Sequence, residues 1–367
     1  MKMLVVATHI LVPGSHGGST HVSELVNALR RHGRVLLLAR QGSSGRDTLG
    51  VAWWKKLPPR GLGHALSAAY LTRCLGAVRE FAPDVIYERG SSMGLGWMLS
   101  RLLKLPLLVM VLDEHVSPLS LAAADRIIAT RMDVVPARYH GKTHIVSWGA
   151  NADRFRPDID GQGVRQRLGW SAEQVVVAYT GSFQPWHGLT VLVRAAARLR
   201  EFDSFRFLLI GGGHEEAAIR ALINELGLQD RIVITGKVPY DEVPEYLAAA
   251  DVAVAPFEPS RHAPSSGKTF TLDPLKIFEY LAMGLPTVTV GADNIMALFS
   301  APDEIRTFAE SDDADLATVL ADVAQNLDVA RAQAAAGRQK VLARHTWQGL
   351  GDHLAQLFGD MLAERRR

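Results

Sequence analysis

The chain has 367 residues, of which 48% are hydrophobic, enough to bury the cores of two ordinary domains. Its 40 basic and 38 acidic residues give a formal net charge of +2, which argues against nucleic acid as a partner of the whole molecule. The single cysteine, Cys74, excludes an internal disulfide and a cysteine-based zinc cluster and fits a reducing compartment. We therefore expect a two-domain, cytoplasmic protein.

Short β-rich runs alternate along the chain with amphipathic helical stretches. In the first half the predicted strands are 3–7, 34–39, 85–87 and 107–112, and the predicted helices are 19–32, 66–81 and 93–103. A second series of predicted strands follows at 175–179, 205–210, 231–235, 252–255 and 286–290. This alternation is typical of a parallel sheet covered by helices on both faces. Because it occurs twice, we predict two Rossmann-like, doubly wound α/β domains.

The stretch 148–157 contains glycine, asparagine and proline and predicts a linker between the two series. We place an N-terminal domain at residues 1–150 and a C-terminal domain at 151–345. The last amphipathic segment, 346–367, is expected to be a helix that packs back toward the N-terminal domain. Ligands of such sheets bind at the carboxyl ends of the strands, so the loops after strands are the places to search for chemistry.

The segment 272–286 predicts a short helix with well-marked ends. Asp273 suits the N-cap, Pro274 suits the first helical position, and Gly284 suits the left-handed position after the last turn.

Lys276 and Glu279 stand three residues apart near the start of this predicted helix, so they share one face. The unpaired N–H groups and the dipole of a helix N-terminus attract phosphate, and the lysine adds a full positive charge. A carboxylate one turn further on can accept two ribose hydroxyls. The pair therefore predicts a nucleotide diphosphate site, with an exposed salt bridge on an amphipathic helix as the alternative reading.

Two glycine clusters also lie beside predicted strands or helices. Gly17 and Gly18 precede a helix, and 211–213 follow an apolar strand, so both predict either a close approach of backbone to phosphate or a plain tight turn. Glu216 stands where a dinucleotide fingerprint needs glycine, and His262 stands where a P-loop ending at 267–269 needs one. Both of those readings are therefore excluded.

Five segments together resemble the GT-B glycosyltransferases, specifically the retaining family 4 and its subgroup with a Trp-His-Gly sequence. In chain order they are Gly17-Gly18 with His21, then 87–91, 181–188, 208–213 and 274–286. The resemblance implies two domains facing each other across a cleft. It also implies a metal-independent hexosyltransferase without a cofactor, which moves a sugar from a nucleotide-diphosphate sugar, UDP-sugar favoured, to a hydroxyl with retention.

The resemblance assigns roles to individual residues. Glu279 would bind the ribose, Lys276 and the helix N-terminus would hold the diphosphate, and main-chain groups around Val238 would pair with the nucleobase. His115, which follows a predicted strand, is preferred over His9 and His21 as the histidine near the reacting sugar. The catalytic candidates are therefore His115, Lys276 and Glu279, and the donor-binding candidates are Gly17, Gly18, Gly181, Ser182, His187, Gly212, Gly213, Val238, Lys268, Lys276, Ile277 and Glu279.

The chain departs from the family pattern at three positions. Ser182 and His187 replace an arginine and a lysine that reach the diphosphate, and Thr271 replaces the first of two paired glutamates. Phosphate charge would then be met by Lys276, the helix terminus and the loop cations Arg261 and Lys268. Two alternatives stay open: a 2-epimerase-like isomerase that uses a nucleotide sugar, since such enzymes share the two-domain architecture, or a non-catalytic scaffold that binds one, which these departures suggest.

No group of residues has the spacing of a metal site, since 312–315 is most simply a helix start. The acceptor is expected to be a lipid-linked glycan, a polysaccharide or a secondary-metabolite core. The stretch Trp53–Arg60 combines aromatic and basic residues, which is typical either of a peripheral membrane contact or, as we favour, of a surface loop. No feature of the sequence indicates an oligomeric state.

Overall fold

The computed structural model describes residues 1–14, 17–54, 62–112, 116–262 and 275–366. The chain divides into two compact units, Met1–Trp148 with Trp347–Arg367, and Gly149–Thr346. It therefore crosses between the units twice. The two crossing segments lie side by side in the second unit, because Ala150 pairs with Thr346 as a parallel bridge and donates its N–H to the carbonyl of His345 (3.0 Å).

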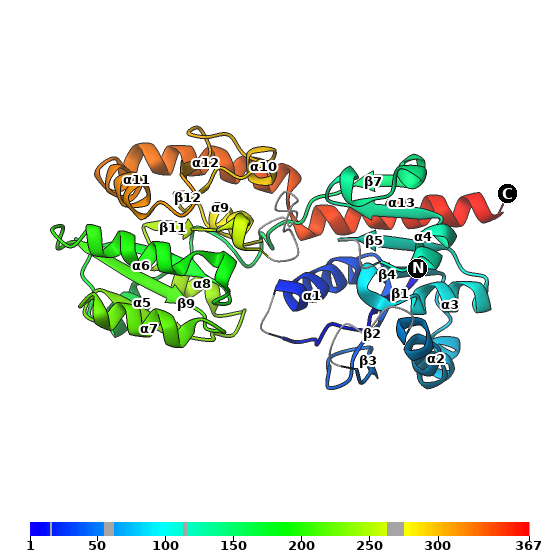
Figure 1. Cartoon of the computed structure of the whole chain (residues 1–367). Helices are drawn as coiled ribbons and strands as arrows, with labels where there is room; N and C mark the ends of the chain where they lie inside the picture. The colour runs from blue at the N-terminus through cyan, green and yellow to red at the C-terminus, as the bar shows by residue number, and fades with distance from the viewer. Residues whose placement is uncertain (15–16, 55–61, 113–115, 263–274, 367) are drawn as a thin grey trace. The chain divides into compact units, whose positions relative to one another are not determined.

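The first unit is built on a parallel sheet in the order β3-β2-β1-β4-β5-β6-β7 (Figure 1). Its strands are β1 (Lys2–Ala7), β2 (Arg34–Arg40), β3 (Thr48–Ala52), β4 (Val85–Arg89), β5 (Leu107–Val111), β6 (Arg126–Ala129) and β7 (Thr143–Ile145). Its helices are α1 (Gly17–Arg30), α2 (Leu62–Phe81), α3 (Leu95–Leu103), α4 (Pro118–Ala123) and α13 (Trp347–Arg366).

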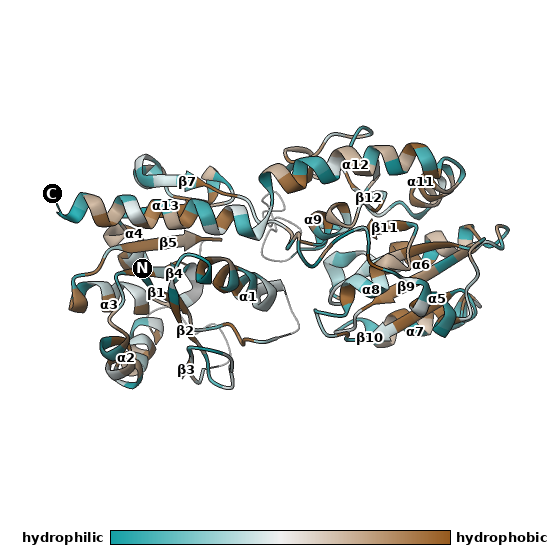
Figure 2. Cartoon of the chain, turned by 180° about the vertical axis from the view of Figure 1, so that it is seen from behind, coloured by the Kyte–Doolittle hydropathy of each residue, from teal (hydrophilic) through white to brown (hydrophobic). Residues whose placement is uncertain are grey.

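Strand β1 shows why a continuous apolar run forms a central strand. Leu4 and Val6 join a core cluster that includes Tyr70 of α2 and Leu99 of α3. Successive side chains of a strand point to opposite faces, so Met3 and its odd-numbered neighbours pack on the other side and are equally buried. A strand covered on both faces has no polar side, and Figure 2 accordingly shows the central strands as hydrophobic.

Helix α13 returns from the second crossing to pack beside α1. A Cβ on Gly351 would lie 2.8 Å from the Cβ of Ala28, so the two helices touch where Gly351 has no side chain. Leu354 and Phe358 of α13 are fully buried in this unit. The last helix is therefore part of the core of the first unit.

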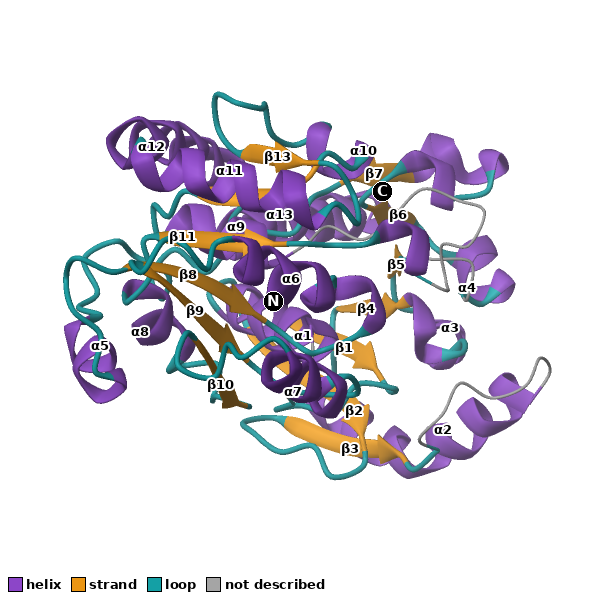
Figure 3. Ribbon diagram, turned by 60° about the vertical axis from the view of Figure 1, so that its left-hand side comes forward, coloured by secondary structure: helices purple, strands orange, loops and turns teal. Residues whose placement is uncertain are grey.

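The second unit repeats the plan with a parallel sheet in the order β10-β9-β8-β11-β12-β13 (Figure 3). Its strands are β8 (Val175–Thr180), β9 (Phe205–Ile210), β10 (Ile232–Gly236), β11 (Val252–Ala255), β12 (Thr287–Val290) and β13 (Arg306–Phe308). Its helices are α5 (Gln162–Leu168), α6 (Leu189–Arg198), α7 (Glu216–Glu225), α8 (Val243–Ala248), α9 (Leu275–Ala282), α10 (Asp293–Met296), α11 (Asp313–Gln325) and α12 (Leu327–Arg344).

The order of the strands locates a switch point in each sheet. From β8 the chain runs through α6 to β9 on one side, and β11 later pairs with β8 on the other side. The corresponding neighbours in the first unit are β1 and β4. Ligands of doubly wound sheets bind outside the carboxyl ends of the two strands at such a point. The loops after β8 and β11, and those after β1 and β4, are therefore the candidate sites.

Two doubly wound parallel sheets confirm the predicted fold class, and every predicted strand is present within two residues at its ends. Four strands were not predicted: β3, β6, β7 and β13. They have three to five residues, and all but β6 are edge strands, where one partner suffices. Helix α1 begins at Gly17 and not at residue 19, so the predicted turn glycines are its first residues. Among the described residues, no helix is long and apolar enough to cross a membrane.

Candidate functional site

The loops after β8 and β11 are joined at the switch point of the second unit. The N–H of Glu258 donates to the carbonyl of Trp186 (2.9 Å). Gly188 has a φ of +65°, and a Cβ at this position would lie 1.6 Å from the carbonyl oxygen of Pro256. Glycine is therefore required at the end of the Trp-His-Gly segment, because the two loops approach too closely for any side chain.

The glycines after β8 and β9 bring a third loop to the same edge. Gly211 has a φ of +144°, and a Cβ there would lie 1.9 Å from the carbonyl oxygen of Gly181. Phe183 donates its N–H to the carbonyl of Gly212 (3.2 Å), and Gly213 packs against the backbone of Phe183. The two predicted glycine motifs of this unit thus pack on each other.

Helix α9 lies at this edge and is fixed in and after its last turn. The hydroxyl of Tyr280 accepts hydrogen bonds from the N–H (2.8 Å) and the Oγ1 (3.1 Å) of Thr180, the last residue of β8. Just after the helix Gly284 has a φ of +74°, and the N–H of Leu285 donates to the carbonyl of Tyr280 (3.0 Å). This is the Schellman arrangement expected of a terminal glycine. The predicted caps Asp273 and Pro274, with Lys268 and Thr271, lie outside the described residues.

Lys276 reaches from the first turn of α9 to the glycine loop after β8. Its Nζ lies 4.0 Å from the ring centre of Tyr179 and 4.9 Å from that of Phe257. A Cβ on Gly181 would lie 3.0 Å from Nζ. The amine is fully buried and has no hydrogen-bond partner in the part of the chain that the structure describes. Burial lowers the pKa of Lys276 from 10.5 to about 7, while the nearby Glu279 carboxylate acts to raise it.

Glu279 lies one turn further along α9, and its side chain is buried. The hydroxyl of Tyr240 donates to Oε1 of this carboxylate (2.7 Å). Tyr240 belongs to the turn 236–240 after β10, which also contains Val238. The structure therefore brings together the turn expected to hold the base and the carboxylate expected to hold the ribose. Ile277, which lies between Lys276 and Glu279 in the sequence, is fully buried in the core.

The sequence of this unit matches a known family. Residues 174–326 match the family described as Glycosyl transferases group 1, a range that holds all the strands of the sheet and α9. The second unit is thus similar to the group 1 glycosyltransferases over most of its length. Over 99% of both chains the structure also superposes on the sucrose-phosphate synthase of Thermosynechococcus elongatus, with a TM-score of 0.79 and 19% identity. The chain has the GT-B fold, as the sequence predicts.

Relatives with assigned activities align over part of their length. The D-inositol 3-phosphate glycosyltransferase of Acidothermus cellulolyticus is 28% identical over 263 residues, which is 67% of this chain and 55% of the relative. The GDP-mannose-dependent alpha-(1-6)-phosphatidylinositol monomannoside mannosyltransferase of Mycolicibacterium smegmatis is 28% identical over 220 residues, 57% of this chain and 54% of the relative. The chain thus matches about half the length of these relatives.

Ser182 and His187, two of the departures from the family pattern, contact each other in the loop after β8. The carbonyl of Ser182 accepts a hydrogen bond from the hydroxyl of Tyr179 (2.8 Å) and lies within hydrogen-bond distance of Nδ1 of His187. Burial, with the nearby Lys276, lowers the pKa of His187 to about 3. His187 is therefore neutral at physiological pH and supplies no positive charge where the family pattern has lysine.

Arg261, one of the two loop cations considered for phosphate, is held by carboxylates. Its guanidinium pairs with Glu258 (2.9 Å) and lies 3.7 Å from Glu215. Glu258 is buried and also accepts a hydrogen bond from the hydroxyl of Ser311 (2.7 Å). The charge of Arg261 is thus balanced within the loop, which leaves Lys276 as the cation aimed at the glycine edge among the described residues of this domain.

The corresponding edge of the first unit is built differently. Gly17 is exposed, and a Cβ there would meet nothing within 4 Å, so Gly17 is not required by packing. Gly14 is the crowded position instead, because a Cβ there would lie 2.3 Å from Oγ of Ser19. Gly18 is half-buried in the first turn of α1. His115, the preferred catalytic histidine, lies outside the described residues.

Of the two other histidines of this edge, His21 is buried and His9 is half-buried. The imidazole of His21 lies edge-on between Trp148 (4.3 Å between ring centres) and Trp347 (5.3 Å). Burial, with the nearby Arg89, lowers the pKa of His21 well below 6.5 and that of His9 to about 4. Both side chains are therefore neutral, and the contacts of His21 are those of a core residue.

Glu88, in the motif 87–91, caps a helix. Its buried carboxylate accepts hydrogen bonds from the N–H groups of Gly94 (3.0 Å) and Trp97 (3.1 Å) at the start of α3. A Cβ on Gly96 would lie 2.7 Å from the Cβ of Glu88. Burial raises the pKa of Glu88 to about 7. The motif is thus explained by the packing of β4 against α3.

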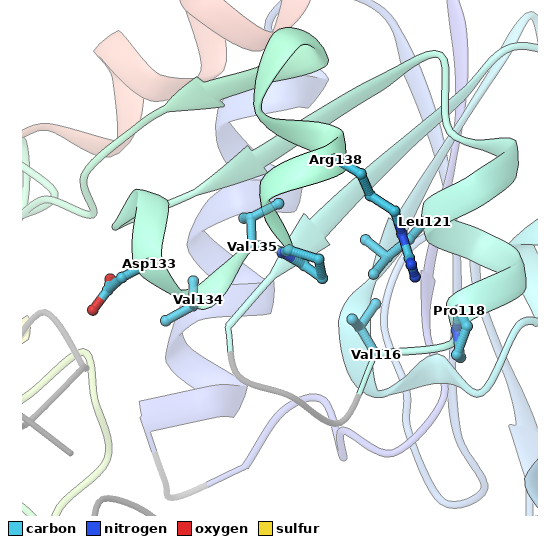
Figure 4. Close-up of a pocket in the computed structure, with 8 residues that line it drawn as sticks. Val116, Pro118, Leu121, Asp133, Val134, Val135 and Arg138 are labelled. Atoms are coloured by element: carbon cyan, nitrogen blue, oxygen red, sulfur yellow. The ribbon is translucent and has the colours of Figure 1, made fainter.

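A pocket of about 300 Å³ opens in the first unit beyond the ends of β5 and β6 (Figure 4). Most of its lining is apolar, with one carboxylate and one guanidinium, and consists of Val116, Pro118, Leu121, Asp133, Val134, Val135, Pro136 and Arg138. Figure 4 shows the side chain of Arg138 extending toward Leu121. Asp133 is paired with Arg131 (2.7 Å), so Arg138 is the cation available to a bound group.

Within the described part of the chain, no group of three or more His, Cys, Asp or Glu side chains is arranged to hold a metal ion. Four aromatic residues that shape the site were not among the predicted site residues, namely Tyr179, Tyr240, Phe257 and Tyr280. Tyr280 lies inside the segment 274–286, and Tyr240 lies two residues after Val238. Their aromatic side chains were a sign that they pack near the site. Their contact partners across the sheet edge could not be predicted, because these partners are distant in the sequence.

Proposed function

We propose that this protein is a glycosyltransferase that moves a sugar from a nucleotide-diphosphate donor to a hydroxyl group. The observation that carries the proposal is the buried amine of Lys276, which has no hydrogen-bond partner among the described residues and points at the glycine loop beside the switch point of the second unit. A buried amine without a partner is costly unless an anion completes the site. Glu279, one turn away, supplies the carboxylate that a ribose requires.

In the proposed reaction the bond between the sugar carbon C1 and the diphosphate oxygen breaks as the acceptor oxygen bonds to C1. Negative charge grows on the departing diphosphate. The Lys276 ammonium and the N-terminus of α9 would stabilise this charge. A retaining course follows if the acceptor enters on the face that the diphosphate leaves, with a diphosphate oxygen taking the hydroxyl proton. Protein cations and the helix dipole would then replace a metal ion.

The nucleobase and the acceptor are parts of this proposal. UDP is our first candidate, and GDP is the second because the Mycolicibacterium relative is named for GDP-mannose. The apolar pocket with Arg138 supports an acceptor that combines an apolar segment with an anionic group, as lipid-linked glycans do. Trp53 and Trp54, each 38% exposed, are compatible with a peripheral membrane contact, whereas 55–61 lie outside the described residues.

Thermal-shift and hydrolysis measurements with UDP-, GDP-, ADP- and dTDP-sugars test the donor site. We expect stabilisation by one nucleotide class, unchanged by a chelator and lost in Lys276→Ala and Glu279→Ala. Lys340→Ala is the matched control, because Lys340 also lies over an aromatic ring in this domain (5.7 Å from the Phe299 ring centre) but away from the edge. Stabilisation by none of the four classes would contradict the proposal.

The same screen separates the competing readings. A scaffold would be stabilised by a nucleotide sugar and release no nucleotide on addition of acceptors or water. An epimerase would convert the donor into its isomer, detected by chromatography of the sugar. The epimerase reading is not favoured, because the family match and the named relatives are transferases.

A further inference from the structure

Glu279 is a buried carboxylate whose orientation matters for any ligand that it binds. A carboxylate removed from water requires hydrogen bonds, and the one from the Tyr240 hydroxyl to Oε1 is short (2.7 Å). A carboxylate can accept about four hydrogen bonds in all. Acceptance from Tyr240 is therefore compatible with acceptance from two ribose hydroxyls.

Tyr240 is itself fixed by its neighbours. The ring of Phe155, which is fully buried, packs against it with ring centres 5.6 Å apart. The guanidinium of Arg154 lies over the tyrosine ring, 4.7 Å from its centre, and pairs with Asp241 (2.8 Å). A ring held between a buried phenyl group and a paired guanidinium has little rotational freedom. Its hydroxyl, and with it the Glu279 carboxylate, therefore keeps one orientation without a ligand.

We propose that Tyr240 is a positioning residue, which holds Glu279 in the orientation that accepts the ribose hydroxyls and thereby makes the site selective for ribonucleoside over 2′-deoxyribonucleoside diphosphates. The inference rests on the proposed donor site. A preorganised acceptor discriminates strongly against an analogue that lacks a hydroxyl, because the polar group of the protein is then left without its partner. A carboxylate that can turn would lose part of that discrimination.

The substrate class follows from this arrangement. The donor is expected to be a sugar attached to UDP, GDP or ADP, and a dTDP-sugar is expected to bind weakly because it lacks the 2′-hydroxyl. The role of Tyr240 differs from that of Lys276, which acts on the diphosphate that both kinds of nucleotide share. A change at Tyr240 should therefore alter the ratio of affinities, and a change at Lys276 should weaken both.

Calorimetric titration of the full chain with UDP, GDP and ADP and with their 2′-deoxy counterparts tests this inference. We expect the wild type to prefer the ribonucleotide by at least about tenfold. In Tyr240→Phe the ratio of the two affinities should fall by about tenfold, the effect of losing one hydrogen bond to a charged group. The control is Tyr246→Phe, since Tyr246 also lies under an arginine, Arg167 (6.0 Å), but belongs to α8.

The outcomes are distinct. An affinity ratio that falls in Tyr240→Phe and stays constant in Tyr246→Phe supports the positioning role, and thermal unfolding of both variants shows whether they are folded. A ratio that is unchanged in a folded Tyr240→Phe protein, even if both affinities drop, overturns the role while leaving the donor site intact. Failure of the wild type to bind any of the six nucleotides overturns the donor site, and this inference with it.

Discussion

Lys276 shows how a single residue can be poorly suited to the folded protein and well suited to a ligand. Its amine lies against two aromatic rings, which attract a cation, yet no carboxylate or carbonyl accepts a hydrogen bond from it among the described residues. Burial lowers its pKa from 10.5 to about 7, so near neutral pH the empty protein holds the amine in both protonation states. Such residues are typical of functional sites.

Replacement of this lysine should stabilise the fold. Because the pKa is lower in the folded protein, the unfolded chain binds more protons between pH 7 and 10.5, and the contribution of Lys276 to stability rises with pH through that window. Below about pH 7 its unfavourable effect is fully present. We expect Lys276→Met to raise the free energy of unfolding at pH 7 by about 0.5–2 kcal/mol and to flatten its pH dependence, measured by urea denaturation. An equally large loss of stability would contradict this account.

The titration of Lys276 should also affect ligand affinity. Stability rises with pH above about 7, whereas affinity for an anionic ligand should fall. An anionic diphosphate favours the protonated amine, so nucleotide binding takes up a proton and weakens as the pH rises above about 7, by up to about tenfold per pH unit. Lys276→Met should bind more weakly and lack this part of the dependence. Calorimetric titrations of both proteins between pH 6 and 9 measure it. Parallel pH profiles for the two proteins would show that another group titrates.

Helix α9 is the element that carries the two central side chains, and contacts at its C-terminal end fix its position. The Tyr280 hydroxyl joins the helix to the end of β8, while Gly284 takes the left-handed conformation that ends it. The eight residues of α9 are too few for a stable helix in isolation. Its position is therefore set by these contacts and by the burial of its apolar face.

A side chain at Gly284 tests this view of α9. A residue with a Cβ at φ +74° is strained, so Gly284→Ala should lower the free energy of unfolding by about 1–2 kcal/mol. The built Cβ is 3.7 Å from its nearest neighbour, so backbone strain and not a clash is responsible. Gly163→Ala is the control, because Gly163 lies inside α5 with comparable space and should be neutral or stabilising. Equal effects in the two variants would contradict the assignment.

At the scale of the whole molecule, two cores are built from a chain that crosses between them twice. Each sheet is buried on both faces, and α13 contributes Leu354 and Phe358 to the core of the first unit although it follows the second unit in sequence. The first unit thus includes residues separated by the entire second unit. Its stability therefore depends on α13 as well as on the residues that precede the second unit.

Calorimetry of the full chain should resolve this organisation. Phe358→Ala should lower the free energy of unfolding of the first unit by about 3–5 kcal/mol and so lower the temperature of its transition. The matched Phe278→Ala should do the same to the second unit. A nucleotide present at one hundred times its dissociation constant should raise the free energy of unfolding of the second unit by about 2.7 kcal/mol. If both substitutions and the nucleotide shift one common transition, the two units unfold together and the prediction is wrong.

The sequence by itself determined the parallel strands and the C-terminal end of α9 at Gly284, because buried strands are continuous apolar runs and because glycine follows from a local backbone requirement. It also indicated that Lys276 and Glu279 share a face, which is a property of helical spacing. Only the tertiary structure decided that Gly181 makes room for the lysine, that Tyr240 bonds to Glu279, and that the arginine at 261 is neutralised by Glu258. These contacts join residues from different strands and loops, and their energies depend on burial, which is created only when the sheet has formed.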